Sequence, residues 1–139
     1  MAGKLTFTMI KPTAFKNNYA GAILKMMNEA GFVIKAMKLT RLTLEQAGAF
    51  YEVHKGKPFY ETLKQFMSSG PIIALILEKE NAVEDYRTLI GATNPENAAE
   101  GTIRKLYATN FQQNAVHGSD SDENANLESD FFFSKTERF

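Results

Sequence analysis

Apolar and polar residues alternate near the start of the chain and again after an intervening helical segment. From Lys4 to Ile10, apolar side chains alternate with threonines, which predicts a β-strand that Lys11-Pro12 ends. Residues 19–30 carry apolar side chains at helical spacing, and Gly31 follows where a helix C-terminal glycine belongs. The alternation returns over residues 32–42 and predicts a second strand.

The middle of the chain predicts two helices and the most buried strand. Thr43-Leu44-Glu45-Gln46 fits a capping box, so a helix is expected to follow to about Val53. A short helix over residues 60–67 is expected after the break at Gly56-Lys57-Pro58. Pro71–Lys79 is the most apolar stretch, which is typical of a strand buried on both faces.

The last third predicts helices over residues 81–90 and 101–107, a very short strand over 115–117, and a helix from Ser119-Asp120-Ser121-Asp122 to about Phe133. The resulting order is β-α-β-α-α-β-α-α-β-α. With helices on one face of the strands, this order indicates a compact α+β or α/β domain. No linker or repeat interrupts it, so residues 1–139 are expected to form a single domain.

Composition and charge narrow the class of protein. The 44% hydrophobic and 23% charged fractions are ordinary for a globular protein. The longest apolar run, Ile72–Leu77, is far shorter than the roughly 20 residues of a membrane span, and no signal-peptide core precedes it. We therefore expect a soluble, cytoplasmic protein with no membrane partner. Residues 1–70 carry ten Lys and Arg against four Asp and Glu, and the remainder six against twelve, but no stretch is basic enough to predict a nucleic-acid partner.

Several kinds of chemistry are excluded by what the sequence lacks. The absence of cysteine excludes a disulfide framework, a thiolate metal site and a cysteine nucleophile. No two glycines have the spacing of a GxGxxG fingerprint or a GxxxxGK phosphate loop. Two histidines without cysteine also argue against a transition-metal site built by the protein.

The densest polar segment runs from Asn114 to Ser121 and contains His117. A helix start directly after His117 suits an anion such as phosphate, and neutral imidazole is a good nucleophile toward phosphorus. The alternative is a structural histidine followed by an ordinary helix cap. These residues alone favour that alternative by a modest margin.

Three cations, Lys11, Arg87 and Arg104, would neutralise a polyphosphate if they met in one cleft. The alternative is three unrelated surface residues, because spacing along the chain does not establish convergence. Phe59, after Pro58, can stack on a base or belong to the core. His54 lies at a predicted helix end, where a histidine commonly complements the helix dipole.

Taken together, these segments resemble the nucleoside diphosphate kinase family. The resemblance covers about Leu5 to Phe133 in the family's order and spacing, and the segment from Asn114 to Ser121 is its most specific part. The matching segments are Thr6–Pro12, Phe50-Tyr51, Lys57–Tyr60, Met67–Pro71, Leu89–Pro95, Gly101–Arg104 and Asn114–Ser121.

The resemblance implies a ferredoxin-like βαββαβ core, in which helices cover a four-stranded antiparallel sheet. It implies that the γ-phosphate of a nucleoside triphosphate, mainly ATP, passes to a nucleoside diphosphate by a ping-pong mechanism through a phosphohistidine on His117. Such an activity maintains nucleoside and deoxynucleoside triphosphate pools. Mg²⁺ is expected to arrive on the nucleotide phosphates rather than in a protein cage.

The resemblance also implies individual roles. The substrate-binding residues are Lys11 and Asn114 for the sugar hydroxyls and phosphate end, Phe59 for the base, and Arg87, Thr93 and Arg104 for the phosphates. The supporting residues are Tyr51 near the histidine, Ser119 in the local turn, and Glu128, which hydrogen-bonds the other ring nitrogen of His117.

The chain departs from the family pattern after Arg104. Many relatives have Asp two residues after this arginine, whereas this chain reads Arg104-Lys105-Leu106. The family also implies a homo-oligomer, and both hexamers and tetramers occur in it. Relatives with longer C-termini use them between subunits, whereas this chain ends soon after the last predicted helix, so the C-terminus leaves the two assemblies open. The Asn94-Pro95 loop, which builds the trimer contact in the family's hexamers, favours a hexamer over a tetramer.

Two other classes remain to be weighed. A non-catalytic binding module is expected to lose His117, Lys11 or an arginine, and all of these are present. A histidine phosphocarrier would not need the base and sugar contacts of Phe59, Lys11 and Asn114. The enzyme is therefore favoured.

Overall fold

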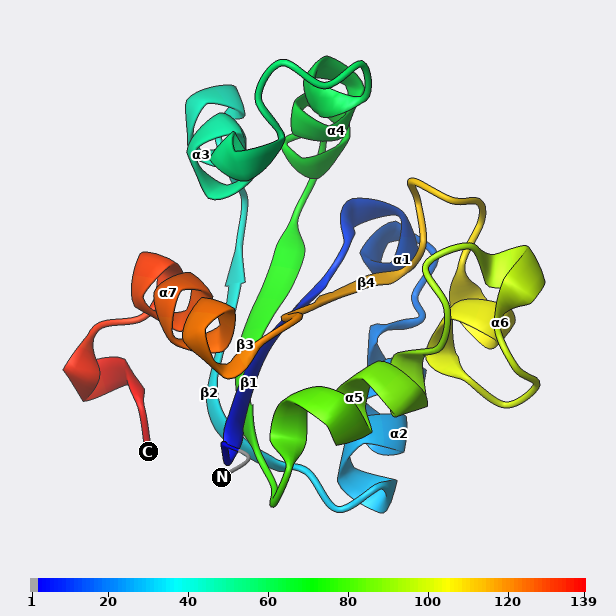
Figure 1. Cartoon of the computed structure of the whole chain (residues 1–139), viewed down its shortest axis with the longest axis vertical. Helices are drawn as coiled ribbons and strands as arrows, with labels where there is room; N and C mark the ends of the chain where they lie inside the picture. Colours follow the sequence, from blue (N-terminus) through cyan, green and yellow to red (C-terminus); the bar gives the residue numbers. More distant parts are fainter. Residues whose placement is uncertain (1–2) are drawn as a thin grey trace.

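A computed structural model describes residues 3–139. Its centre is one four-stranded antiparallel sheet with the strand order β2-β3-β1-β4 (Figure 1). This arrangement confirms the ferredoxin-like sheet that the family resemblance implies. The strands are β1 (Leu5–Ile10), β2 (Val33–Thr40), β3 (Ile72–Glu78) and β4 (Val116–Gly118).

Seven α-helices and three 3₁₀ turns surround the sheet within residues 3–139. The α-helices are α1 (Pro12–Lys16), α2 (Ala20–Glu29), α3 (Leu44–Phe50), α4 (Tyr60–Met67), α5 (Ala82–Ile90), α6 (Ile103–Tyr107) and α7 (Asp122–Phe132). The 3₁₀ turns are η1 (Glu52–His54), η2 (Pro95–Asn97) and η3 (Lys135–Glu137). None of the helices in the described part of the chain is long and apolar enough to cross a membrane.

Helices cover both faces of the sheet, so the expectation of helices on one face is wrong. On one face, Phe7 and Met9 of β1 pack with Ala47 of α3, Leu63 of α4 and Phe132 of α7. On the other face, a second apolar cluster joins β1 and β3 to α2, α5 and α6. The alternation along β1 causes this division, because odd-numbered and even-numbered side chains point to opposite faces.

The local signals in the sequence explain most element boundaries. The Thr43 hydroxyl accepts from the Gln46 N–H and the Gln46 side chain accepts from the Thr43 N–H, which confirms the capping box. Gly31 ends α2 with a φ of 93°, in the left-handed region that favours glycine. The helix α1 was not predicted. Its Pro12 occupies the first turn, where proline's missing N–H costs nothing.

Candidate active site

The short strand β4 carries His117 and forms one edge of the sheet, next to β1. His117 pairs with Met9 of β1. The turn before it is tight, because Ala115 has a φ of 75° and the Val116 N–H donates to the Asn114 carbonyl at 2.9 Å. A non-glycine residue in this left-handed region stores strain, which is common at functional sites. The turn lets Asn114 and His117 line the same cavity.

A carboxylate from α7 orients the His117 ring. The His117 Nε2 atom lies 2.9 Å from Glu128 Oε1, and the Ser119 hydroxyl donates to the same oxygen at 2.5 Å. Because an ionised carboxylate only accepts, this contact assigns the ring hydrogen to Nε2. The lone pair then lies on Nδ1, which takes no hydrogen bond from residues 3–139. Carboxylate contacts of this kind fix both the tautomer and the orientation of a histidine.

Aromatic rings hold the imidazole from one side. Phe50 meets the His117 ring edge-to-face at a centroid distance of 5.4 Å, and Tyr51 does so at 6.2 Å. Tyr51 is buried, and its hydroxyl has no partner within residues 3–139. Burial raises the pKa of the Tyr51 phenol, so this group stays neutral at physiological pH.

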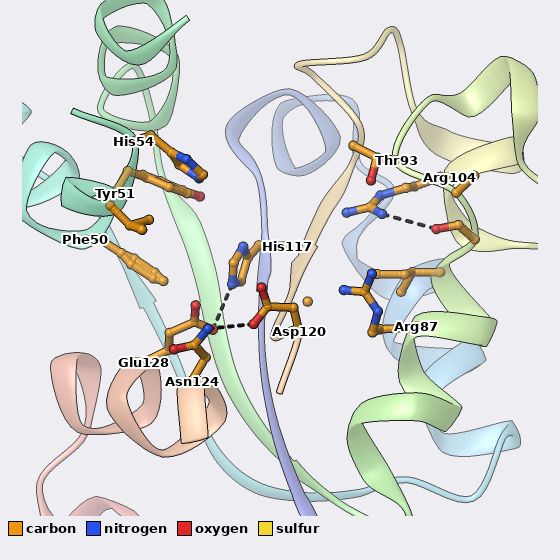
Figure 2. Close-up of a pocket in the computed structure, with 15 residues that line it drawn as sticks. Phe50, Tyr51, His54, Arg87, Thr93, Arg104, His117, Asp120, Asn124 and Glu128 are labelled. Atoms are coloured by element: carbon orange, nitrogen blue, oxygen red, sulfur yellow. Dashed lines mark hydrogen bonds and ion pairs between the residues drawn. The ribbon is translucent and has the colours of Figure 1, made fainter. Parts of the chain in front are cut away.

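Arginines form the opposite wall of a cavity of about 410 Å³ (Figure 2). Arg87 extends from α5, and Arg104 extends from α6 beside Thr93, all across the cavity from Phe50 and Tyr51. This wall presents two guanidinium groups to the space in front of His117. A guanidinium fork matches the oxygens of a phosphate group.

Arg104 is fixed and largely desolvated. Its two terminal nitrogens donate to the Gly91 carbonyl at 3.2 Å and the Val116 carbonyl at 2.9 Å, while its buried Nε has no partner in the described part of the chain. Burial is the main cause that lowers the pKa of Arg104 to about 10, with a contribution from nearby Arg87, so it remains charged at neutral pH. Leu106, the position at which the chain departs from the family pattern expected from the sequence, is an exposed side chain on α6.

Lys11 and Asn114 form a buried polar pair at the end of β1. The Lys11 Nζ donates to Asn114 Oδ1 at 2.8 Å, and the Asn114 amide donates to the Thr93 carbonyl at 3.3 Å. Lys11 is only 7% exposed. Burial, and secondarily the charge of Arg104, lowers the pKa of Lys11 to about 7. An anion bound here would raise this pKa and restore the charge.

Phe59 stands beside a second cavity of about 380 Å³ that adjoins the first. The Phe59 side chain is 43% exposed, which is unusual for a large apolar group and leaves a ring face available for stacking. Five residues line both cavities: Tyr51, His54, Thr93, Arg104 and His117. The two cavities together have room for an aromatic base near Phe59 and for phosphates near His117.

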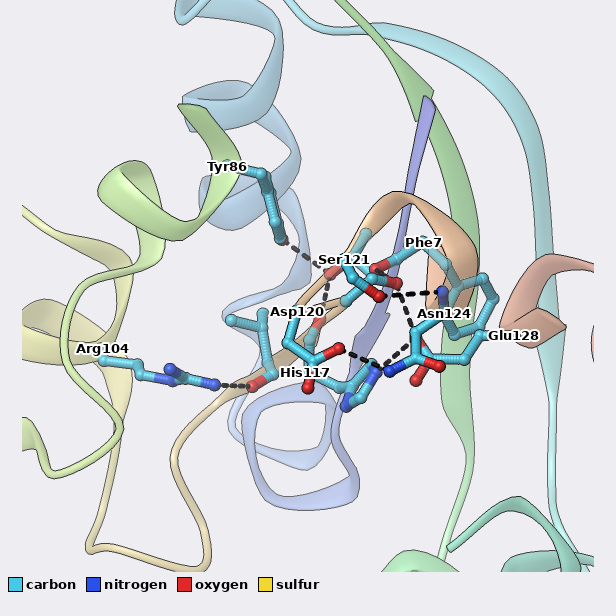
Figure 3. Close-up of polar contacts among 11 residues, drawn as sticks. Phe7, Tyr86, Arg104, His117, Asp120, Ser121, Asn124 and Glu128 are labelled. Carbon is cyan, nitrogen blue, oxygen red and sulfur yellow. Dashed lines mark hydrogen bonds and ion pairs between the residues drawn. The ribbon is translucent and has the colours of Figure 1, made fainter. Parts of the chain in front are cut away.

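The structure brings all ten sequence-predicted residues to this cleft or directly behind it. Lys11, Arg87 and Arg104 converge, which spacing in the sequence could not establish, and Phe59 is not a core residue. Glu128 lines the larger cavity beside His117, and Ser119 supports it through the hydrogen bond to the Glu128 Oε1 atom. Figure 3 shows the contact of Glu128 with His117 among the polar contacts of this region.

Sequence reasoning missed several residues that line the cleft. His54 ends η1, and its ring lies 5.1 Å from that of Phe59, with a buried Nδ1 that has no partner within residues 3–139. Its position at a helix end suggested only a dipole contact. Asp120 accepts from the Asn124 amide at 2.6 Å, and both line the larger cavity. Asp120 lies inside the Gly-Ser-Asp-Ser segment, which was the available signal for it.

The part of the chain that the structure describes contains no group of three or more His, Asp or Glu side chains that could hold a metal ion. Glu128 is committed to His117 and Ser119, so Asp120 is the carboxylate of the cavity that has coordination sites to spare. This donor set fits a hard cation that keeps most of its oxygen ligands from phosphate and water.

The fold and the site together define a ferredoxin-like enzyme with an oriented histidine facing a cationic, phosphate-sized cleft. The family model described as nucleoside diphosphate kinase matches residues 4–138. A nucleoside diphosphate kinase of Flavobacterium psychrophilum is 63% identical over the whole of both chains, and one of Chlorobaculum tepidum is 60% identical over 95% of this chain and 94% of its own.

Solved structures agree with these relatives. The Aquifex aeolicus nucleoside diphosphate kinase superposes with a TM-score of 0.96 at 42% identity, covering 98% of this chain and 99% of its own. A halophilic nucleoside diphosphate kinase from Halobacterium salinarum, solved in complex with CDP, gives 0.94 at 33% identity over 98% and 91% of the two chains. The chain therefore belongs to the nucleoside diphosphate kinase family and is an enzyme.

Proposed function

We propose that this enzyme moves the γ-phosphate of a nucleoside triphosphate, mainly ATP, to a nucleoside diphosphate through a phosphohistidine on His117. The observation that supports this most directly is the contact of His117 Nε2 with Glu128, which leaves the lone pair on Nδ1 of a ring that lines the same cavity as Arg87 and Arg104. A covalent intermediate replaces one ternary encounter by two binary ones, which gives ping-pong kinetics.

In the first half-reaction, the Nδ1 lone pair forms a bond to the γ-phosphorus while the bond from phosphorus to the bridging oxygen breaks. The diphosphate leaves with that electron pair. Glu128 stabilises the positive charge that develops on the imidazole. The second half-reaction is the reverse with a different diphosphate, so the atoms and charges balance over one cycle. The net result evens out the pools of nucleoside and deoxynucleoside triphosphates.

The other residues bind the nucleotide and neutralise the charge of its phosphates. Arg87, Thr93 and Arg104 hold the phosphates, because charge neutralisation and positioning are the main tasks in phosphoryl transfer. Lys11 and Asn114 bind the sugar hydroxyls and the phosphate end. Phe59 stacks on the base, and stacking alone accepts every base because each has a π-face.

The supporting residues hold the His117 ring in position. Tyr51 packs against the His117 ring, and Ser119 fixes the Glu128 oxygen that orients it. Asp120, which lines the cavity, would help to hold Mg²⁺ arriving on the nucleotide phosphates, and the ion would neutralise phosphate charge there. The cysteine-free chain fits a reducing compartment, and we place the activity in the cytoplasm.

We propose a homo-oligomer and favour a hexamer over a tetramer. The Asn94-Pro95 loop, which the family resemblance links to hexamer contacts, is ordered locally because the Asn94 side chain accepts from the Glu96 N–H at 3.1 Å. Sedimentation equilibrium tests this proposal. A mass six times 15.6 kDa supports it, and a mass four times that value contradicts it.

Labelling with γ-labelled ATP and Mg²⁺, without acceptor, tests the mechanism. We expect acid-labile, base-stable label on the chain that GDP discharges with formation of GTP. His117→Ala should take no label, whereas His54→Gln, which removes the other histidine, should still take it. Label that no diphosphate can discharge would indicate a phosphocarrier. A folded, ATP-binding chain without label would indicate a non-catalytic module.

A further inference from the structure

Two buried hydroxyl groups connect the backbone of His117 to helix α5. Thr8 of β1 and Tyr86 of α5 are both fully buried. The Thr8 hydroxyl donates to the His117 carbonyl at 2.7 Å, and the Tyr86 hydroxyl lies 2.7 Å from the same Thr8 oxygen. The dashed lines that lead from Tyr86 toward the His117 segment in Figure 3 mark these contacts.

The direction of this chain of hydrogen bonds is determined by its acceptor. A carbonyl oxygen only accepts, so the single hydroxyl hydrogen of Thr8 is used for His117. Tyr86 must then donate to Thr8. Burial raises the pKa of the Tyr86 phenol, which keeps this donor protonated. Hydrogen bonds in series polarise one another and resist displacement.

The Tyr86 ring packs against both Phe32 and the β4 strand. Its ring meets Phe32 edge-to-face at 5.5 Å. A β-carbon at Gly118, the residue after His117, would lie 3.3 Å from a Tyr86 ring carbon and 2.9 Å from Ile90. The strand that carries the histidine therefore rests directly on the helix that carries Arg87, the residue after Tyr86.

We propose that Thr8 and Tyr86 are positioning residues that fix the His117 strand relative to the Arg87 helix. β4 is only three residues long and is paired with β1 at the edge of the sheet. The two hydroxyl groups supply an additional connection between the strand that carries His117 and the helix that carries Arg87. The inference rests on the proposed function, in which His117 attacks a phosphate that Arg87 helps to hold.

The chain offers a matched control on the same strand. Thr6 is also fully buried on β1, two residues before Thr8 and on the same face, but its hydroxyl has no partner within residues 3–139. Thr6→Val and Thr8→Val make the same chemical change. Only the second removes a contact with His117.

The test compares these variants with Thr8→Ser in two measurements. The first is the single-turnover rate of His117 phosphorylation by labelled ATP with Mg²⁺, and the second is the dissociation constant for ADP by calorimetry. We expect Thr8→Val to slow phosphorylation on the order of 10-fold, because small misplacements of a reacting group are costly, with ADP affinity retained. Thr8→Ser should restore the rate, and Thr6→Val should match the parent.

Tyr86→Phe tests whether the two hydroxyls act in series. It should slow phosphorylation alone, and adding it to Thr8→Val should cause no further loss, since the chain of hydrogen bonds is already broken. Independent, multiplying effects would overturn the series arrangement, and a parental rate in Thr8→Val would overturn the proposal. If Thr8→Val does not fold, the rate of Tyr86→Phe decides in the same way. A parent chain that takes no label would instead refute the proposed function.

Discussion

Replacing Lys11 by methionine should stabilise the protein while it removes one of the nucleotide contacts proposed above. Lys11 is 7% exposed, and burial with the Arg104 charge lowers its pKa from 10.5 to about 7. A difference of this size corresponds to about 5 kcal/mol against the charged form in the folded protein. Methionine has a similar length and no charge, although the Asn114 oxygen then loses a donor, which costs about 1–3 kcal/mol.

The sign of the pH dependence follows from the two pKa values. Between about pH 7 and pH 10.5 the unfolded chain binds more protons at Lys11 than the folded chain, so the unfolding free energy of the wild type increases as the pH rises. The free-energy cost of burying the charged Lys11 side chain is fully present below pH 7. We therefore expect Lys11→Met to exceed the wild type by about 2–4 kcal/mol at pH 6, and the difference to shrink by about 3 kcal/mol at pH 9.

Urea unfolding followed by circular dichroism at pH 6 and pH 9, at one protein concentration, measures both quantities. Lys25→Met is the matched control, because the Lys25 side chain is 73% exposed on α2. It should change stability by less than about 0.5 kcal/mol at either pH. If Lys11→Met is less stable than the wild type at pH 6, or if its difference from the wild type does not change with pH, the assignment of a desolvated cation at this position is wrong.

Three further predictions concern the other parts of the site. Glu128→Gln should lower the rate of His117 phosphorylation by about 10- to 100-fold while ADP affinity is retained, because this range is typical of losing a carboxylate that orients a histidine. Loss of ADP binding instead would argue against an orienting role. Phe59→Ala should weaken ADP and GDP binding by about 1–3 kcal/mol each in calorimetry, and a loss confined to one base would exclude simple stacking. Gly91→Ala should lower the melting temperature by several degrees, because Gly91 has a φ of 87° and a β-carbon there would lie 2.6 Å from the Thr102 hydroxyl oxygen. An unchanged melting temperature would show that the backbone at Gly91, whose carbonyl accepts from Arg104, can move enough to avoid this clash.

Periodicity in the sequence was sufficient to predict the strands and most of the helices. The threonine alternation in β1 and the apolar run in β3 each identified a strand within one or two residues of its bounds. The same alternation was also the clue to helices on both faces, because Phe7 and Ile10 are apolar on opposite sides of β1. The short helix α1 escaped because five residues are too few for a periodic pattern.

The candidate site was harder to predict because its parts come from distant segments. Arg87 and Arg104 line the same cavity as His117 because β4 pairs with β1 at the edge of the sheet. The spacing of these residues along the chain does not reveal that pairing. The family resemblance supplied the convergence that local reasoning left open. His54 illustrates the remaining gap, since its position at a helix end predicted a dipole contact while its ring lies beside Phe59 in the cleft.

Several costs to folding gather in this one cleft. The Arg104 Nε and the Tyr51 hydroxyl are buried without partners in the described part of the chain, Lys11 is desolvated, and Ala115 is in the left-handed region. Each lowers stability in the free protein, and natural proteins retain such features where function needs them. An anionic phosphate would relieve the largest of these costs, because it neutralises the buried cations. In the proposed function, the same groups that weaken the empty fold are therefore preorganised for the charge of a nucleotide.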